Sequence, residues 1–200
     1  MFQKGDLMRP KEFEPDAIAD AAMNVFWQRG YASTSVQDLV DGTGLGRSSI
    51  YNFFGSKHEL YESALRRYHD WSGATLDVLN EADPVKELIR RILMSIVDDE
   101  LDSESHNGCM VANASLELAG HDPIVAALVA ENFDRMERAF DGALCRAQRD
   151  GEVAPDKDPK ILAKFIVNTI QGIRVLGKGS AESDRRARLL GVVDTAMSVL

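Results

Sequence analysis

Residues 34–60 read TSVQDLVDGTGLGRSSIYNFFGSKHEL, and this stretch decides the fold of the N-terminal part of the chain. Two serines in it, Ser35 and Ser56, are each followed three positions later by an acidic residue. This spacing is typical of a capping box, in which each residue satisfies a free backbone N–H group of a helix start. Gly44 separates the two segments and permits a tight turn between them. The stretch predicts a helix over residues 36–42, a turn, and a second helix over residues 46–53.

Short amphipathic helices cannot bury their apolar stripes alone, so these two need a third helix to pack against. The residues before the stretch supply one, with an expected helix over residues 15–29. The apolar positions that recur at helical spacing are Ile18, Ala22, Val25 and Phe26, then Val36, Leu39, Val40 and Leu45, then Ile50 with Phe53 or Phe54. Packing of these stripes predicts a helix-turn-helix, with Leu45 filling its corner.

The second helix of the stretch keeps one face that packing does not use. This face carries Arg47, Ser48, Ser49, Tyr51 and Asn52. Small polar and basic side chains at the exposed start of a helix suit the major groove of DNA. A solvated surface charge for Arg47, and a half-buried supporting role for Tyr51, are the alternative interpretations.

The rest of the chain is marked by regular helix signals. Asp-Pro pairs at 83–84, 122–123 and 158–159 predict helix starts, because Asp caps the free N–H groups and Pro lacks one. Gly30, Gly55, Gly120 and Gly151 lie where helices are expected to end. About nine helices follow, near residues 15–29, 36–42, 46–53, 57–80, 84–99, 109–119, 123–150, 159–177 and 184–200. No segment alternates with the period of a strand, so the fold class is all-α.

The helix lengths predict two parts. Three short helices form a head over residues 1–55, and longer helices form a body over residues 56–200. The polar segment from Glu100 to Gly108 is the expected mobile loop.

The composition limits the function classes. Two cysteines and four scattered histidines give neither a disulfide framework nor the spacing of a metal site, so no metal and no cofactor is expected. No apolar run is long enough for a membrane span, and the charged residues 1–16 lack an apolar core, so we expect no signal peptide and a cytoplasmic protein. The net charge is −9, and residues 1–54 carry five Lys or Arg against seven Asp or Glu. This balance neither supports nor excludes a basic DNA-binding face, because screening makes the local charge decisive.

Residues 26–31, FWQRGY, together with the stretch above resemble the N-terminal domain of the TetR/AcrR family of repressors. The resemblance implies a dimeric regulator with an N-terminal helix-turn-helix DNA-binding domain and a larger helical ligand-binding and dimerisation domain. It places Thr34 or Ser35 on phosphate, Gln37 on a base or phosphate, Arg47 and Ser49 on base edges, and Tyr51 and Lys57 on the DNA backbone. Gly46 and Asn52 differ from the residues usual at their positions in the family. The predicted DNA-binding set is Thr34, Ser35, Gln37, Arg47, Ser48, Ser49, Tyr51, Asn52 and Lys57.

Two late helices carry apolar stripes. In the resembled family the last two long helices form a four-helix bundle with a second copy, so the stripes predict a homodimer that spans successive major grooves. Closure of a core within one chain is the alternative. The predicted interface residues are Leu162, Phe165, Ile166, Ile173, Leu176, Leu189, Val193 and Met197.

The resemblance also implies a pocket for an unknown small-molecule effector among the middle helices, and no charged cluster identifies a charged effector. Its predicted lining is Trp71, Met94, Cys109, Met110, Asn113, Phe133, Met136 and Phe140, and plain core is the alternative for each. A thiol at a helix start is acidified by the helix dipole, so Cys109 is a candidate sensor. Gly108-Cys109, followed by Asn113 and Glu117, resembles the subgroup of the family that senses electrophiles or oxidants. A small buried apolar residue is the alternative for Cys109.

The sequence thus favours a transcriptional regulator, expected to be a repressor, that binds a palindromic operator and releases it when an effector binds. A helical ligand-binding or thiol-sensing protein with weakened DNA affinity is a second hypothesis. An all-helical enzyme is a third, but no nucleophile and base stand at a catalytic spacing, so we expect no enzyme.

Overall fold

The computed structural model describes residues 15–102 and 107–200 of the chain. Over these residues the chain forms nine α-helices, one 3-10 helix and no strand, which confirms the predicted all-α class. The elements are α1 (Pro15–Arg29), α2 (Val36–Thr43), α3 (Arg47–Phe54), α4 (Lys57–Gly73), η1 (Ala74–Asn80), α5 (Val85–Leu101), α6 (Met110–Glu117), α7 (Pro123–Arg149), α8 (Pro159–Gly179) and α9 (Glu182–Val199). None of the described helices is both long and apolar enough to cross a membrane. The expected loop at 100–108 falls partly on residues outside the described ranges.

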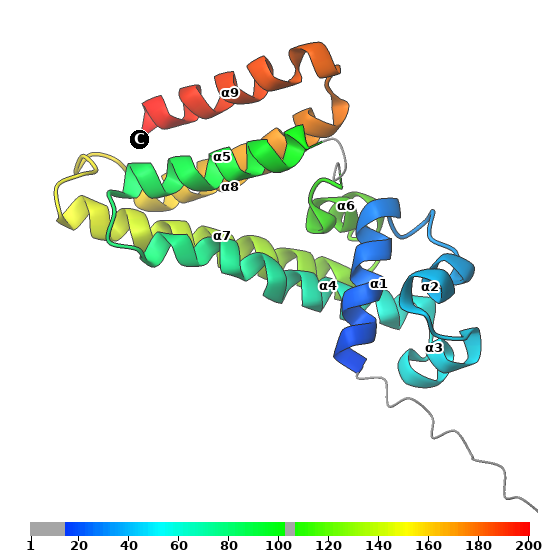
Figure 1. The fold of residues 1–200 in the computed structure, drawn as a ribbon. Helices are drawn as coiled ribbons and strands as arrows, with labels where there is room; N and C mark the ends of the chain where they lie inside the picture. The colour runs from blue at the N-terminus through cyan, green and yellow to red at the C-terminus, as the bar shows by residue number, and fades with distance from the viewer. Residues whose placement is uncertain (1–14, 103–106) are drawn as a thin grey trace, which may run out of the picture.

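The helices form a small head and a layered body (Figure 1). Helices α1, α2 and α3 lie together at one end, and α9 lies over α5 and α8 at the other. The long helices α4 and α7 connect the two ends, and α6 lies between the head and the body. This arrangement places the outward face of α3 far from α9.

Two apolar cores hold this arrangement. One core joins η1 to α5, α7, α8 and α9, and includes the fully buried Phe140 and Leu93. The other joins α1–α4 to α6 and the first half of α7, around Phe26 and Tyr61. Because the second core contains residues from both sides of position 55, the head packs directly on the body. The boundary at residue 55 stays a prediction.

Two of the three Asp-Pro pairs start helices as expected. The carboxylate of Asp122 accepts the N–H groups of Ile124 and Val125, each at 3.0 Å, at the start of α7. Asp158 accepts that of Lys160 at 2.9 Å at the start of α8. An aspartate cap of this kind satisfies backbone N–H groups that would otherwise lack an acceptor at the start of a helix.

At the third pair the predicted helix start is confirmed to within one residue, but the predicted cap by Asp83 is wrong. The residue before α5 is Pro84, and its side chain forms no hydrogen bond that caps the helix. The N–H groups of Val85 and Lys86 donate instead to the Glu152 carboxylate, at 2.8 and 2.9 Å. Asp83 pairs with Arg91 at 3.0 Å. The cap therefore comes from a residue far away in the sequence, which local spacing cannot indicate.

The predicted dimer stripes need the largest revision. Five of the eight predicted residues are enclosed in the chain's own core, as in the alternative that the sequence left open; they are Leu162, Ile166, Ile173, Leu189 and Val193. Phe165, Leu176 and Met197 are only partly buried. Side chains that α5 and α7 already cover are not available to a partner.

Candidate functional site

The corner between α2 and α3 has the geometry that its glycine predicts. Gly44 has a φ of 70°, and its N–H donates to the Val40 carbonyl at 2.9 Å. Leu45, which is 2% exposed, fills the corner. The reciprocal capping box between Ser35 and Asp38 fixes the start of α2. These contacts hold α3 at a set angle to α2.

Helix α3 turns one polar face to solvent. Arg47, Ser48, Tyr51 and Asn52 are exposed, and the sequence of α3 contains no acidic residue. Ile50, on the opposite side, is 1% exposed and packs into the head core. Because Ile50 is buried in the head core, the predicted DNA-binding side of α3 faces solvent.

The structure also shows the surroundings of Ser49, of the two phenylalanines at 53 and 54, and of Gly46. Ser49 is half-buried, and Phe54 rather than Phe53 packs against the core. Phe53 is 51% exposed. Gly46 caps α3 without a side chain, so the first N–H groups of the helix have no side-chain acceptor. Free N–H groups at a helix start suit a phosphate oxygen.

Thr34 is a correction to the predicted phosphate contacts. Its side chain is 1% exposed, and its hydroxyl donates to the Gly30 carbonyl at 2.6 Å. A hydroxyl enclosed in this way closes the turn after α1 and does not face DNA. Ser35 is exposed, although its hydroxyl serves the capping box, and the exposed Gln37 donates to Asp41 at 2.8 Å.

Lys57 lies at the edge of the same face but is held by Tyr31. Its Nζ donates to the Tyr31 carbonyl at 2.7 Å and lies 4.3 Å from the centre of the Tyr31 ring. Burial lowers the pKa of Lys57 below its ordinary value. The ammonium has further N–H groups to offer, so its contact with phosphate stays a prediction.

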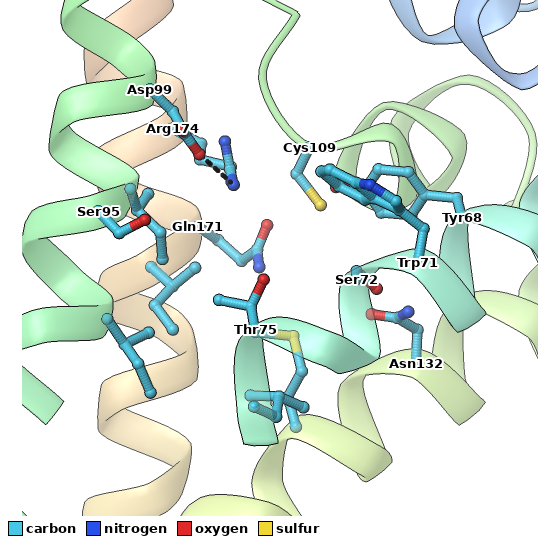
Figure 2. A pocket seen from close by; sticks show the side chains of 15 residues that line it. Tyr68, Trp71, Ser72, Thr75, Ser95, Asp99, Cys109, Asn132, Gln171 and Arg174 are labelled. Carbon is cyan, nitrogen blue, oxygen red and sulfur yellow. Dashed lines mark ion pairs between the residues drawn. The ribbon is translucent and has the colours of Figure 1, made fainter. Parts of the chain in front are cut away.

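A cavity of about 70 Å³ lies within the body (Figure 2). Side chains from α4, η1, α5, α7 and α8 line it, together with Cys109 at the start of α6. Of the predicted lining residues, Trp71, Cys109 and Met136 lie in its wall. Met94, Met110, Asn113, Phe133 and Phe140 do not line it, and Met110 and Phe140 are fully buried parts of the two cores.

The polar side of the cavity was not predicted. Arg174 on α8 pairs with Asp99 at 3.6 Å and with Glu100 at 3.1 Å, both on α5. Gly177 lies one turn after Arg174, and a Cβ there would lie 2.6 Å from the Glu100 side chain. The glycine therefore allows α5 and α8 to approach closely enough for the buried pair. The partners are far apart in the sequence, so local spacing did not indicate this pair.

Several contacts connect the head to the cavity wall and to α6. Trp27 on α1 donates from Nε1 to the Gly108 carbonyl at 2.8 Å, directly beside Cys109. The Trp27 ring also lies edge-on to the Trp71 ring in the cavity wall, with centroids 5.0 Å apart. At the other end of α6, Glu117 accepts the N–H of Ala32 at 2.9 Å. The cavity wall and the head are therefore in direct contact.

We expect Trp27→Phe to lower the free energy of unfolding by about 1 kcal/mol, the usual net value of one hydrogen bond. Phenylalanine keeps most of the ring contact with Trp71 but removes the donor to Gly108. Urea unfolding followed by circular dichroism measures the change. Trp71→Phe is the matched control, because the Trp71 ring is 51% exposed. Equal stability of Trp27→Phe and the unchanged protein would show that this bond contributes nothing.

Comparisons with known proteins agree with this geometry. A family model described as bacterial regulatory proteins, tetR family, matches residues 18–64. A second one, described as tetracyclin repressor-like, C-terminal domain, matches residues 86–190.

Individual relatives match along nearly the whole chain. The HTH-type transcriptional regulator YezE of Bacillus subtilis is 33% identical over 96% of this chain and 98% of its own. The HTH-type transcriptional repressor ComR of Escherichia coli is 30% identical over 92% of this chain and 88% of its own. Among solved structures, a cysteine mutant of the TetR family regulator CifR, complexed with 26-bp double-strand operator DNA, superposes with a TM-score of 0.81. That structure is 31% identical and covers 95% of this chain and 98% of its own.

Proposed function

This chain belongs to the TetR family of bacterial regulatory proteins, and we propose that it is a repressor that binds a palindromic operator as a homodimer. In this proposal a small-molecule effector in the body cavity releases the operator. The chain acts by binding and carries out no catalysis. A cytoplasmic location, where operator DNA lies, stays a prediction.

The exposed face of α3 is the observation that carries the proposal. Arg47 at its N-terminal end offers a planar guanidinium, which pairs best with the two acceptors of guanine in the major groove. Ser48, Tyr51 and Asn52 extend the same exposed face. We propose that Arg47 and Ser49 read base edges, while Ser35, Gln37, Tyr51 and Lys57 position the head on the DNA backbone.

The homodimer needs a surface, and we propose the groove between α8 and α9 for it. This groove has a volume of about 440 Å³ and is lined by Phe165, Asn168, Thr169, Gly172, Leu176, Arg188, Gly191, Val192, Thr195 and Ala196. Gly172 on α8 and Gly191 on α9 leave backbone open to a neighbour, since a Cβ built at either lies within 4 Å of no described atom outside the nearby backbone of its own helix. Two helices presenting small residues in this way can pack closely on the same helices of a second copy.

Release follows from the contacts between the cavity and the head. An effector that fits better when the Trp71 wall has moved favours a state in which Trp27 and α1 have moved too. The two heads of a dimer then take a spacing that no longer matches successive major grooves, which are about 34–36 Å apart.

A mobility shift with the chain's own upstream DNA, repeated across a salt titration, tests the proposal. Phosphate contacts predict an affinity that falls steeply as salt rises. Absence of a shift even at low salt favours the second hypothesis, a helical sensor with weakened DNA affinity.

A second candidate mode of control uses the Cys109 thiol. Its sulfur lies in the cavity wall, and Figure 2 shows it directed into the open space toward Gln171. The residue is 7% exposed overall, so only a small reagent that enters the cavity reaches it. In this mode a group attached to the Cys109 sulfur occupies the cavity permanently, as a bound effector would occupy it for a time.

We expect iodoacetamide to alkylate Cys109, with loss of iodide and of the thiol proton, and to lower the affinity for the operator about tenfold or more. Mass spectrometry locates the adduct, and a mobility shift measures the release. The matched control is Cys145→Ala, which should keep the response, while Cys109→Ala should lose it. Alkylation of native Cys109 no faster than that of a model peptide counts decisively against this mode.

A further inference from the structure

We propose that the cavity selects a small uncharged molecule that donates a hydrogen bond to Gln171, and that it rejects carboxylates although an arginine lines it. This inference rests on the proposed function only in treating the cavity as the effector site. Three features of the cavity support it: the charge of its polar side, an acceptor without a donor, and its size.

The arginine is already neutralised. Arg174 is paired with Asp99 at 3.6 Å and with Glu100 at 3.1 Å, so two carboxylates face one guanidinium. The Glu100 side chain is 1% exposed, and that of Arg174 is 14% exposed. A carboxylate ligand could reach the guanidinium only beside the Glu100 carboxylate, which is itself buried, and a second buried anion there is costly. The polar side of the cavity therefore disfavours anions.

Gln171 supplies the specific contact. Its Oε1 is buried and has no hydrogen-bond partner among the described residues. Figure 2 shows the Gln171 carboxamide at the centre of the open space, between Arg174 above and Thr75 below. A buried acceptor without a donor costs free energy, which a ligand with an O–H or N–H group recovers.

The remaining wall limits the ligand to a compact aliphatic body. The apolar part of the wall consists of Leu76, Ile92, Ile96, Met136 and Ile170. An engineered cavity of about 150 Å³ in another protein holds benzene. The volume here is about 70 Å³, so the cavity holds a ligand of only a few heavy atoms. The chemical class that fits is a short branched alcohol or a similar uncharged donor.

Butan-2-ol and butan-2-one test this inference, because they share a carbon skeleton and differ in whether the oxygen donates a hydrogen bond. We expect the full-length protein to bind the alcohol about fivefold to tenfold more tightly than the ketone. Trp71 lines the cavity and is one of only two tryptophans in the chain, so a titration followed by intrinsic fluorescence measures both affinities. Butyrate should bind more weakly than either. A ketone that binds as tightly as the alcohol, or butyrate that binds most tightly, overturns the inference.

Variants assign the preference to Gln171. Gln171→Leu removes the acceptor while keeping a similar volume, and should bring the two affinities together. Gln28→Leu, on the exposed side of α1, is the matched control and should leave the preference unchanged. A preference that survives in Gln171→Leu contradicts the assignment.

A mobility shift with the upstream DNA separates this inference from the proposed function. If butan-2-ol binds with the expected preference but the operator stays bound, effector release is wrong and the ligand class stands. If the operator binds and no probe shows the preference, the ligand class is wrong and the regulator stands.

Discussion

Gly172→Leu is expected to leave the chain folded but monomeric, and to lower operator affinity roughly a hundredfold to ten-thousandfold. The affinity falls because two linked heads reach the second half-site at a high effective concentration, whereas a single head does not. A Cβ at Gly172 lies within 4 Å of no described atom outside the neighbouring backbone of α8, so we expect a leucine to extend into the groove without a clash with the backbone of its own subunit. Leucine also favours a helix by about 1 kcal/mol relative to glycine. The substitution therefore acts on the partner and not on the fold.

Sedimentation velocity measures the change in mass, and a mobility shift measures the affinity. Gly191→Leu on α9 should act in the same way, because it lines the same groove. Gly120→Leu is the matched control: it also has open space around it but lies between α6 and α7, away from the groove. A Gly172→Leu protein that remains a dimer would place the interface on another surface.

Arg47→Ala is expected to lower affinity for the operator by roughly 1–3 kcal/mol, which is about tenfold to a hundredfold, and to relax specificity at one base pair. The Arg47 side chain is exposed at the first position of α3, so its loss should not disturb the head core. Binding to unrelated DNA should change much less, because that binding depends on phosphate contacts. Competition with operators changed at single positions measures which base pair loses its effect.

Lys57→Ala is the informative comparison. It should weaken binding to all sequences alike and reduce the dependence on salt. It also removes the bond to the Tyr31 carbonyl, so its stability must be measured alongside. If Arg47→Ala lowers operator binding and nonspecific binding equally, Arg47 does not read bases.

The local features of this fold could be predicted from the sequence because neighbouring residues determine them. The capping box at Ser35, the turn at Gly44 and the Asp caps at 122 and 158 all depend on partners within four positions. The outward face of α3 could also be predicted from neighbouring residues, since Ile50 determines which side of the helix is buried.

Features that depend on distant partners could not be predicted in the same way. Helix α8 is apolar on more than one side, so its pattern did not reveal that Ile166 and Ile173 face the core while Phe165 lines the outer groove. The pairing of Arg174 with Glu100 joins positions 74 residues apart. In both cases the neighbouring helix, and not the local pattern, decides what each side chain contacts.

The carboxylate of Glu152 has a mechanical consequence. By accepting the first N–H groups of α5, it fastens the end of α7 that lies away from the head. Helix α7 has 27 residues, which corresponds to roughly 40 Å at about 1.5 Å per residue. The other end of α7 packs into the core of the head, so a tilt of the helix by about 5° about the Glu152 end moves the head end by roughly 3–4 Å. A small rearrangement near the Glu152 end can thus become a displacement of several ångströms at the head.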